Sequence, residues 1–172
     1  MKYLLFVPLA LGLLVALLAL VGTLLPREHT ATRVAAFRQP PAVIYAAVRD
    51  FAGQSAWRSA VKAVELLPPR AGAVSYREIG RDGAVTYVVR EERPGEKLVV
   101  EIADENLPYG GRWIFTVHAA GRGSELRIAE EGFVKNVIFR CLARFVFGYT
   151  GTMETYLRDL GKKFGEPVTP AP

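Results

Sequence analysis

The chain has 172 residues, of which 51% are hydrophobic, and 22 Lys and Arg against 17 Asp and Glu give a net charge of +5. The hydrophobic excess lies at the start, because residues 3–25 carry no charge and 19 of these 23 residues are hydrophobic. The remainder is about 46% hydrophobic, which is ordinary for a globular domain. We therefore expect one membrane segment and one domain, and we exclude a multi-span transporter, a disordered chain and a disulfide scaffold.

The apolar segment at residues 3–25 would form a helix about 34 Å long, which suffices to cross a bilayer core of about 30 Å. The alternative is a cleaved signal peptide, whose apolar core usually spans about 7–15 residues and ends in an A-x-A-like site. This run is longer, and its end at residues 20–25 (LVGTLL) is a poor cleavage site. The pattern favours an uncleaved anchor over residues 1–26, followed by a domain over 27–164 and a tail over 165–172.

The distribution of charges argues against nucleic-acid binding but does not fix the orientation of the anchor in the membrane. Beyond the anchor, 21 Lys and Arg against 17 Asp and Glu give a net charge of +4, and the cations are scattered. A nucleic-acid interface needs a basic stripe with exposed aromatics, so we expect no nucleic acid. Lys2 and the amino terminus lie on one side of the anchor and Arg27, Arg33 and Arg38 on the other, so the side of the membrane stays open.

The middle of the chain has the pattern of an antiparallel meander. A loosely alternating strand over 30–37 ends at Gln39-Pro40-Pro41, and helical spacing from Pro41 to about Asp50 follows, with a further helical turn at 54–57. Predicted strands then cover residues 61–67, 74–79, 85–92, 97–103, 111–119 and 124–134. The first of these ends at Pro68-Pro69, and Asp82-Gly83 is typical of a hairpin turn. Short turns between successive strands predict antiparallel pairing.

The end of the chain has helical periodicity. Apolar residues recur at steps of three and four from residue 137 to 164, which predicts one amphipathic helix of about 28 residues. Gly148 and Gly151 should loosen or bend it near the middle. The tail, residues 165–172, has nothing to bury and should be disordered. Together these elements predict an α+β domain in which the long helix covers one face of the sheet.

Several short strings resemble a known superfamily. They are Asp50 followed by Trp57-Arg58, residues 107–113 (LPYGGRW), 130–132 (EEG), Phe139-Arg140 and 145–148 (FVFG). Over residues 29–164 the chain resembles the START/Bet v 1-like (SRPBCC) superfamily, most closely a membrane-anchored subgroup of its polyketide cyclase/dehydrase-like branch.

This resemblance implies a helix-grip fold, in which a curved antiparallel sheet wraps around a long C-terminal helix. Members of the superfamily bind lipids, sterols, hormones or polyketides in a cavity beneath that helix, and a few catalyse cyclisation. The resemblance therefore implies a hydrophobic ligand for this chain. It does not choose between binding and catalysis, because one fold serves many functions.

Most familiar catalytic arrangements are missing from the sequence. His29 and His118, the only histidines, are expected to lie apart, so neither completes a nucleophile–base–orienter site. Cys141 is expected to be a small core residue. Gly110-Gly111 lacks the following helix of a phosphate loop and is interpreted as a turn. We expect no metal and no cofactor.

Glu130 is the candidate catalytic residue. Period two places it on the same strand face as Leu126 and Ile128, so its carboxylate should project toward the cavity just before Gly132, which is a candidate bulge. An unpartnered carboxylate there could act as a general acid or base. The alternatives are that the strand end curls into solvent, or that Arg140 or Arg144 pairs with Glu130.

Aromatic residues on several elements suggest a ligand cavity. With Glu130, the predicted lining residues are Tyr76, Tyr87, Trp113, Phe115, Phe145, Tyr149 and Met153. Converging aromatics with a few hydroxyls are typical of small-molecule sites, but they are also typical of an ordinary core.

Three hypotheses follow. The first is membrane-tethered binding of a hydrophobic small molecule or lipid between sheet and long helix. The second is a cyclase-type enzyme with Glu130 as acid or base and a tyrosine hydroxyl as its partner. The third is a structural domain with a packed core and no ligand.

Overall fold

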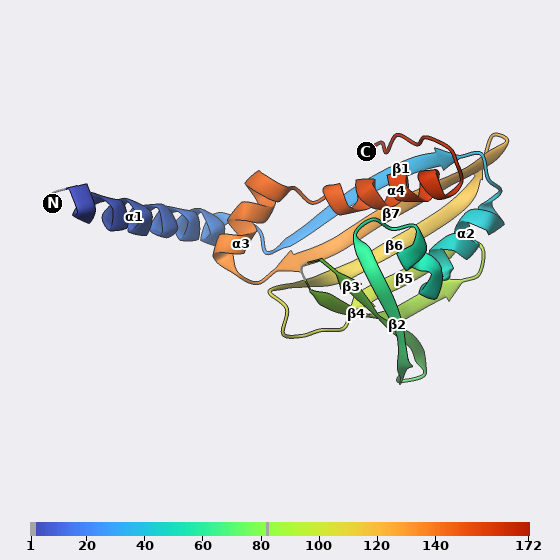
Figure 1. Cartoon of the computed structure of the whole chain (residues 1–172), viewed down its shortest axis with the longest axis horizontal. Helices are drawn as coiled ribbons and strands as arrows, with labels where there is room; N and C mark the ends of the chain where they lie inside the picture. Colours follow the sequence, from blue (N-terminus) through green and yellow to red (C-terminus); the bar gives the residue numbers. More distant parts are fainter. Residues whose placement is uncertain (1–2, 82) are drawn as a thin grey trace.

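The structure is a computed structural model that describes residues 3–81 and 83–172. Four α-helices and two short helical turns accompany seven strands (Figure 1). The helices are α1 Tyr3–Leu24, α2 Pro41–Arg49, α3 Val137–Leu142 and α4 Gly151–Lys163, with a 3-10 turn η1 Ala52–Ala56 and a π-helical turn η2 Ala143–Phe147. The strands are β1 Glu28–Phe37, β2 Val61–Arg70, β3 Ala73–Gly80, β4 Ala84–Arg93, β5 Lys97–Ile102, β6 Tyr109–Ala120 and β7 Gly123–Val134.

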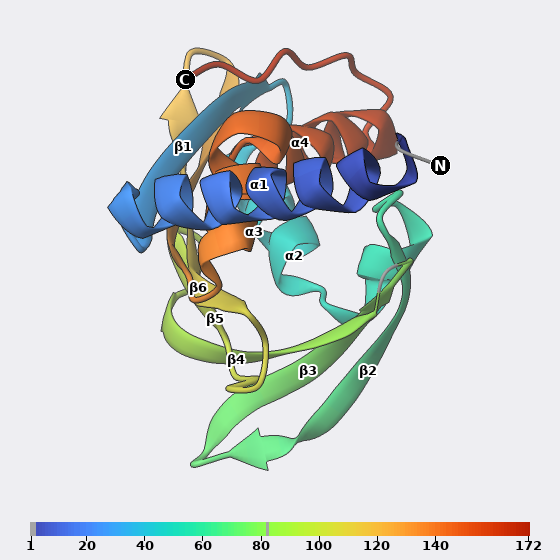
Figure 2. The same ribbon diagram turned by 90° about the vertical axis from the view of Figure 1, so that its left-hand side faces the viewer.

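The strands form one antiparallel sheet in the order β1-β7-β6-β5-β4-β3-β2. Strands β1 and β2 are therefore at opposite edges, and α2 with η1 crosses between them. The sheet curves so that α4 and α2 lie on its concave side (Figure 2). The predicted α+β helix-grip architecture is confirmed.

Strand β2 is longer than predicted, because it continues through Pro68-Pro69 to Arg70. The prolines are tolerated since β2 is an edge strand, where a missing N–H removes no ladder bond on the open side. The pairing of β2 with β3 is irregular between Leu67 and Arg70. Strands β3 and β4 are paired as the hairpin prediction requires, although Asp82 itself lies outside the described residues.

The core lies between the sheet and the two helices on its concave face. Helix α2 begins at Pro41, and it buries Ile44, Tyr45, Ala47 and Val48 against β6 and β7. These residues follow the helical period, so one face of α2 is apolar. Helix α4 buries Met153, Leu157 and Leu160 completely.

The prediction of one continuous helix over residues 137–164 is wrong. After α3, the chain makes the π-helical turn η2, leaves helical geometry at residues 148–150, and resumes as α4. Gly148 has φ 70° and ψ 174°, a conformation that side chains other than glycine adopt only with strain. The long helix of the helix-grip architecture is therefore α4 alone, and α3 is a separate element.

The prediction that the tail has nothing to bury is also wrong. Glu166 is only 7% exposed, and its carboxylate accepts a 2.9 Å hydrogen bond from the Arg38 backbone N–H. Val168 packs against the core, and Ala171 forms an antiparallel bridge with Val34. The tail uses backbone groups that the edge strand β1 would otherwise leave unpaired.

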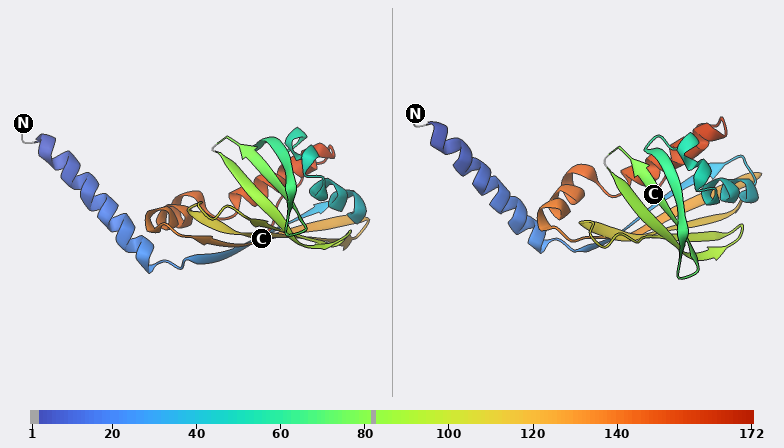
Figure 3. Two further views of the ribbon diagram at one scale, coloured as in Figure 1. Left: turned by 90° about the horizontal axis from the view of Figure 1, so that it is seen from below. Right: turned by 60° about the horizontal axis from the view of Figure 1, so that its bottom comes forward.

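Helix α1 projects from the domain (Figure 3) but is docked against α3. A side chain at Gly22 would collide with the Val137 carbonyl. The buried Arg140 guanidinium donates 3.0 Å hydrogen bonds to the carbonyls of Gly22 and Leu25, and further bonds to the carbonyl of Val134. A cation is favoured at this end of a helix, where the last carbonyls lack partners.

Candidate ligand cavity

Two adjoining cavities lie between the concave face of the sheet and the helices. The first has a volume of about 380 Å³ and the second about 320 Å³. Both are lined by Val85, Tyr87, Val100, Tyr109, Trp113 and Thr152. Each volume lies near the lower end of the range for small-molecule sites, about 300–1,000 Å³.

The first cavity is walled by aromatic rings. Tyr76 stacks on Phe51 at 4.1 Å and on Tyr87 at 5.4 Å between ring centroids. The Tyr156 ring, on α4, contacts the Phe115 ring at 5.5 Å between centroids, and both line the cavity. Tyr76, Tyr87, Trp113 and Phe115, all predicted to line a cavity, thus lie together here.

A partly buried ion pair lies at one side of this cavity. The Arg58 guanidinium donates to the Glu78 carboxylate and, at 2.6 Å, to Gln54 Oε1, and it lies 4.9 Å from the centre of the Tyr156 ring. Burial lowers the pKa of Arg58, but the charge of Glu78, the hydrogen bond to it and the neighbouring Tyr156 and Tyr87 together raise that pKa above its ordinary value, so the guanidinium stays charged. The sequence singled out Arg58 only through the resemblance, because Arg58 lies in the loop after η1 and its partner is twenty residues away on β3.

The tyrosine hydroxyls of the cavity are neutral donors. Burial raises the pKa of Tyr76, Tyr87 and Tyr156 above the usual range. The Tyr156 hydroxyl is buried without a hydrogen-bond partner among the described residues. A buried hydroxyl of this kind carries a free-energy cost that a polar ligand atom could relieve.

The second cavity holds Glu130 and its two partners. Glu130 Oε1 lies 3.0 Å from His29 Nε2, and Glu130 Oε2 accepts a 2.8 Å hydrogen bond from Trp113 Nε1. The alternatives expected from the sequence do not occur, since Glu130 is only partly exposed, Arg140 bonds backbone carbonyls and Arg144 is exposed. The carboxylate is therefore held by a histidine and an indole.

Strand pairing explains this arrangement. Trp113 lies directly opposite Glu130 in the β6–β7 register, and His29 lies opposite Gly132 in the β1–β7 register, which makes His29 a diagonal neighbour of Glu130. A Cβ on Gly132 would lie 2.6 Å from the His29 ring. Gly132 is thus no bulge, as the pairing is uninterrupted there; it leaves room for the histidine, which stacks on Tyr149 at 3.8 Å.

His29 is the functional candidate that sequence reasoning missed. His29 and His118 do lie apart, as expected, because His118 contacts Glu125 at the other end of β6. However, the partner of His29 is a carboxylate 101 residues away. A signal was available, because the helix-grip fold pairs its first and last strands, and this pairing places His29 opposite Gly132 and close to Glu130.

Other predicted residues lie elsewhere. Phe145 is 67% exposed and lines neither cavity, and Met153 is fully buried in the core. Tyr149 does line the second cavity. Gly110-Gly111 is not a turn but belongs to β6. Within residues 3–81 and 83–172, no cluster of three potential ligand side chains suits a metal ion.

A curved antiparallel sheet enclosing an aromatic cavity beneath a C-terminal helix defines the class of helix-grip domains. The chain belongs to the family described as polyketide cyclase / dehydrase and lipid transport, whose model matches residues 28–162. No curated protein matches the chain.

Solved structures show the same fold at low identity. The Zhui aromatase/cyclase from Streptomyces sp. R1128 matches with a TM-score of 0.63 and 10% identity, over 79% of this chain and 93% of that one. The di-domain ARO/CYC StfQ from the steffimycin biosynthetic pathway matches with a TM-score of 0.63 and 12% identity, over 77% of this chain but only 49% of its own. Norcoclaurine synthase from Thalictrum flavum gives 0.63 and 10%, over 80% and 86%.

Proposed function

We propose that the domain binds a hydrophobic small molecule or lipid in the two adjoining cavities while α1 holds it at a membrane. The observation that carries the proposal is the pair of aromatic-walled cavities with a combined set of polar groups, Arg58–Glu78 in one and His29–Glu130 in the other. Apolar walls with a few placed polar groups are typical of small-molecule sites. The family description, which includes lipid transport, supports the same ligand class.

The docking of α1 supports an uncleaved anchor. Residues 7–24 have a mean hydropathy of 2.5 and are almost entirely exposed, as a helix in lipid would be. Removal of α1 would take away the Gly22 carbonyl that accepts a hydrogen bond from Arg140, so the buried guanidinium would lose an acceptor. A cleaved signal peptide would not be expected to supply hydrogen-bond acceptors to a buried side chain of the mature domain. Intact mass and carbonate extraction of the membrane-bound chain test this, and a mature chain that begins near residue 26 would contradict it.

Native mass spectrometry of the full chain, released from detergent micelles, tests the ligand. We expect a reproducible added mass that is extractable into organic solvent. The matched control is Val85→Phe, which places a ring where both cavities are lined and should remove that mass without unfolding the chain. An identical adduct on both chains would mean that the mass is bound elsewhere.

Fluorescence gives a second measurement that works without a natural ligand. The chain has two tryptophans, so Trp57→Phe leaves Trp113, which lines both cavities. We expect 9,10-dibromostearic acid to quench this chain saturably, and Val85→Phe to abolish the saturable part. Quenching that rises only linearly with probe, as from bulk lipid, would indicate a packed core and defeat the binding proposal.

The contact between His29 and Glu130 favours a second candidate function, a cyclase/dehydrase-like enzyme in which Glu130 is the acid or base. A carboxylate held 3.0 Å from an imidazole inside an apolar cavity can exchange a proton with it. The test is Glu130→Gln, which keeps size and shape. An enzyme of this type should retain unconverted substrate in the variant, so its bound mass would exceed the wild-type mass by one water if dehydration is blocked. Equal bound masses in the parent and the variant would argue against catalysis and would support ligand binding without a reaction.

A further inference from the structure

Three consecutive large apolar residues of the domain lie in water-facing positions. Phe145, Val146 and Phe147, in the π-helical turn η2, are 67%, 66% and 62% exposed. Isolated exposed apolar residues are normal, but a contiguous apolar patch marks an interaction surface. We name residues 145–147 the apolar turn.

The apolar turn is continuous with the anchor. It follows α3 directly, and α3 packs against the carboxyl end of α1 through Gly22 and Val137. Figure 1 shows α3 and this turn at the end of the domain from which α1 leaves. If α1 crosses a bilayer, the turn must therefore lie near the surface of that bilayer.

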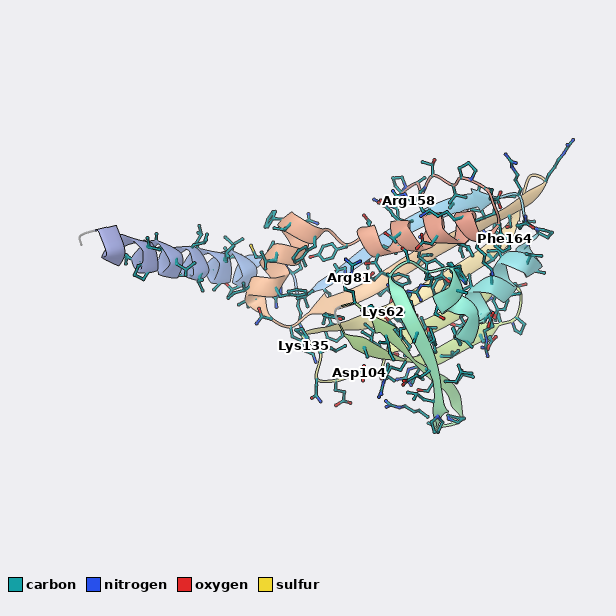
Figure 4. All side chains as sticks on the ribbon, in the orientation of Figure 1. Lys62, Arg81, Asp104, Lys135, Arg158 and Phe164 are labelled. Carbon is teal, nitrogen blue, oxygen red and sulfur yellow. The ribbon has the colours of Figure 1, made fainter. Side chains whose placement is uncertain are left out.

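Three exposed positive side chains lie at the same end of the domain. Arg144 precedes the turn and is exposed, and the Arg27 and Lys135 cations lie 5.3 and 5.9 Å from the centre of the Phe133 ring. Figure 4 places Lys135 on the side of the domain nearest α1. Exposed cations beside apolar side chains match the anionic head groups and acyl boundary of a lipid surface.

The second cavity reaches the same segment. Its lining includes Phe139, Ala143, Phe147, Gly148 and Tyr149, as well as His29 and Glu130 on the sheet. One side chain of the apolar turn, Phe147, is thus both exposed and part of the cavity wall. The backbone at Gly148, where helical geometry ends, forms the adjoining rim.

We propose that the apolar turn is a second membrane contact, which inserts into an anionic bilayer and opens the second cavity toward it. The hydrophobic ligand then passes between the bilayer and the His29–Glu130 end without crossing water. The proposal rests on the proposed membrane anchor and ligand binding, and it adds the lipid surface as a specific partner of residues 145–147. Side chains in such positions typically lie about 5–10 Å into the boundary between head groups and acyl chains.

Site-specific labelling tests the membrane contact without reference to a ligand. The full chain carries Cys141→Ala, which removes the only cysteine, and Val146→Cys bears an environment-sensitive nitrobenzoxadiazole label. It is reconstituted in vesicles of phosphatidylcholine and phosphatidylglycerol. We expect blue-shifted emission and several-fold stronger quenching by doxyl-labelled phosphatidylcholine than in the matched control Arg122→Cys, which lies in the exposed turn between β6 and β7 at the other end of the domain.

A label at residue 146 that is quenched no more than the one at residue 122 overturns the proposal. Saturable quenching of Trp113 would in that case still stand as evidence for ligand binding, so the two proposals can fail separately.

Uptake of 9,10-dibromostearic acid from the same vesicles tests the opening. Val146→Asp, at an exposed position that lines neither cavity, should slow quenching of Trp113 by about tenfold, which corresponds to about 1.4 kcal/mol in the barrier. The extent at equilibrium should remain unchanged, and Arg122→Asp should leave both unchanged. Equal rates in Val146→Asp and the parent would refute the bilayer-facing opening, whereas a loss of equilibrium binding in the parent would refute the proposed function instead.

Discussion

Helix α4 and the segment before it, residues 137–147, share one helical apolar periodicity but are used differently. Met153, Leu157 and Leu160 of α4 are fully buried against the concave face of the sheet, whereas Phe145, Val146 and Phe147 are more than 60% exposed. The two segments are separated by Gly148, and α3 turns toward α1 instead of continuing over the sheet. The same residue types therefore form a core in one segment and a surface in the other.

The difference teaches that an apolar stripe indicates a face that packs against something but does not say against what. The apolar face of α4 packs against the sheet. No described part of the chain packs against residues 145–147, and we propose that a lipid surface does. Substitutions in the two segments should consequently differ in what they damage, and the following predictions begin with the largest expected change in the free energy of unfolding.

Leu157→Ala should lower the free energy of unfolding by about 2–5 kcal/mol, because it leaves a cavity at a fully buried position. Urea unfolding of the full chain in detergent, followed by circular dichroism, measures the change. A decrease in the free energy of unfolding of less than about 0.5 kcal/mol would mean that Leu157 of α4 is not packed against the sheet.

Arg140→Met should lower the free energy of unfolding by about 1–3 kcal/mol, because buried carbonyls at the end of α1 and of β7 lose their donor. It should also make the chain around residues 25–27 sensitive to protease. Arg144→Met, at an exposed position four residues on, is the matched control and should change neither property. Equal protease sensitivity in both variants would argue against docking of α1 by Arg140.

Asp159→Asn tests how α4 is attached. Burial raises the pKa of Asp159, but hydrogen bonds from Ser59 and Lys162 outweigh it, so the pKa lies below the ordinary value. The ionised Asp159 carboxylate therefore stabilises the folded state fully above the unfolded-state pKa of about 3.9. This stabilisation is lost as the pH falls through the lower folded-state pKa.

The expected cost of Asp159→Asn at neutral pH is about 1.5–3 kcal/mol, the usual range for hydrogen bonds to a charged group. Unfolding measured as a function of pH should show a shallower acid dependence in the variant than in the parent. Parallel pH profiles would mean that Asp159 does not carry this charge-dependent stabilisation.

Gly148→Ala and Gly151→Ala should have opposite signs. Gly148 has φ 70° and ψ 174°, a region that is nearly restricted to glycine and costs another residue about 1–3 kcal/mol, so the alanine should destabilise the domain. Gly151 begins α4 with open space around a Cβ, so alanine there should stabilise by about 0.4–1 kcal/mol. Thermal unfolding of both variants measures the contrast, and two stabilising substitutions would indicate a continuous helix.

Phe145→Ser should change the free energy of unfolding by less than about 0.5 kcal/mol, because the side chain is exposed. This smallest effect sharpens the comparison with Leu157→Ala. A cost comparable to that of Leu157→Ala would show that Phe145 is covered by protein and would weaken its assignment to the lipid surface.

Much of the fold was predictable from local patterns. Strand alternation and turn residues predicted the meander, Pro41 predicted the start of α2, and the apolar run predicted α1. The errors arose where neighbours in space decided the outcome. An edge position let β2 pass through Pro68-Pro69, and unpaired groups of β1 recruited the tail.

The candidate site was predictable only in part. Period two placed Trp113 and Phe115 on one face of their strand and Glu130 on the matching face of the next, and the register brings them together. It could not find His29 or the Arg58–Glu78 pair, because those partners are 101 and 20 residues apart. Phe145 was misassigned since helical spacing does not reveal whether a helix continues over the sheet.

By itself, the sequence determined which residues face the same side of each element and which segment is apolar enough to cross a bilayer. These properties depend on the backbone period and on composition, both of which are local. The tertiary structure alone decided that His29 and Trp113 hold Glu130, that Arg140 joins α1 to the domain, and that residues 145–147 stay uncovered. Such contacts depend on long-range strand pairing and on the break at Gly148, because facing directions become neighbours only when the whole sheet has closed around its helix.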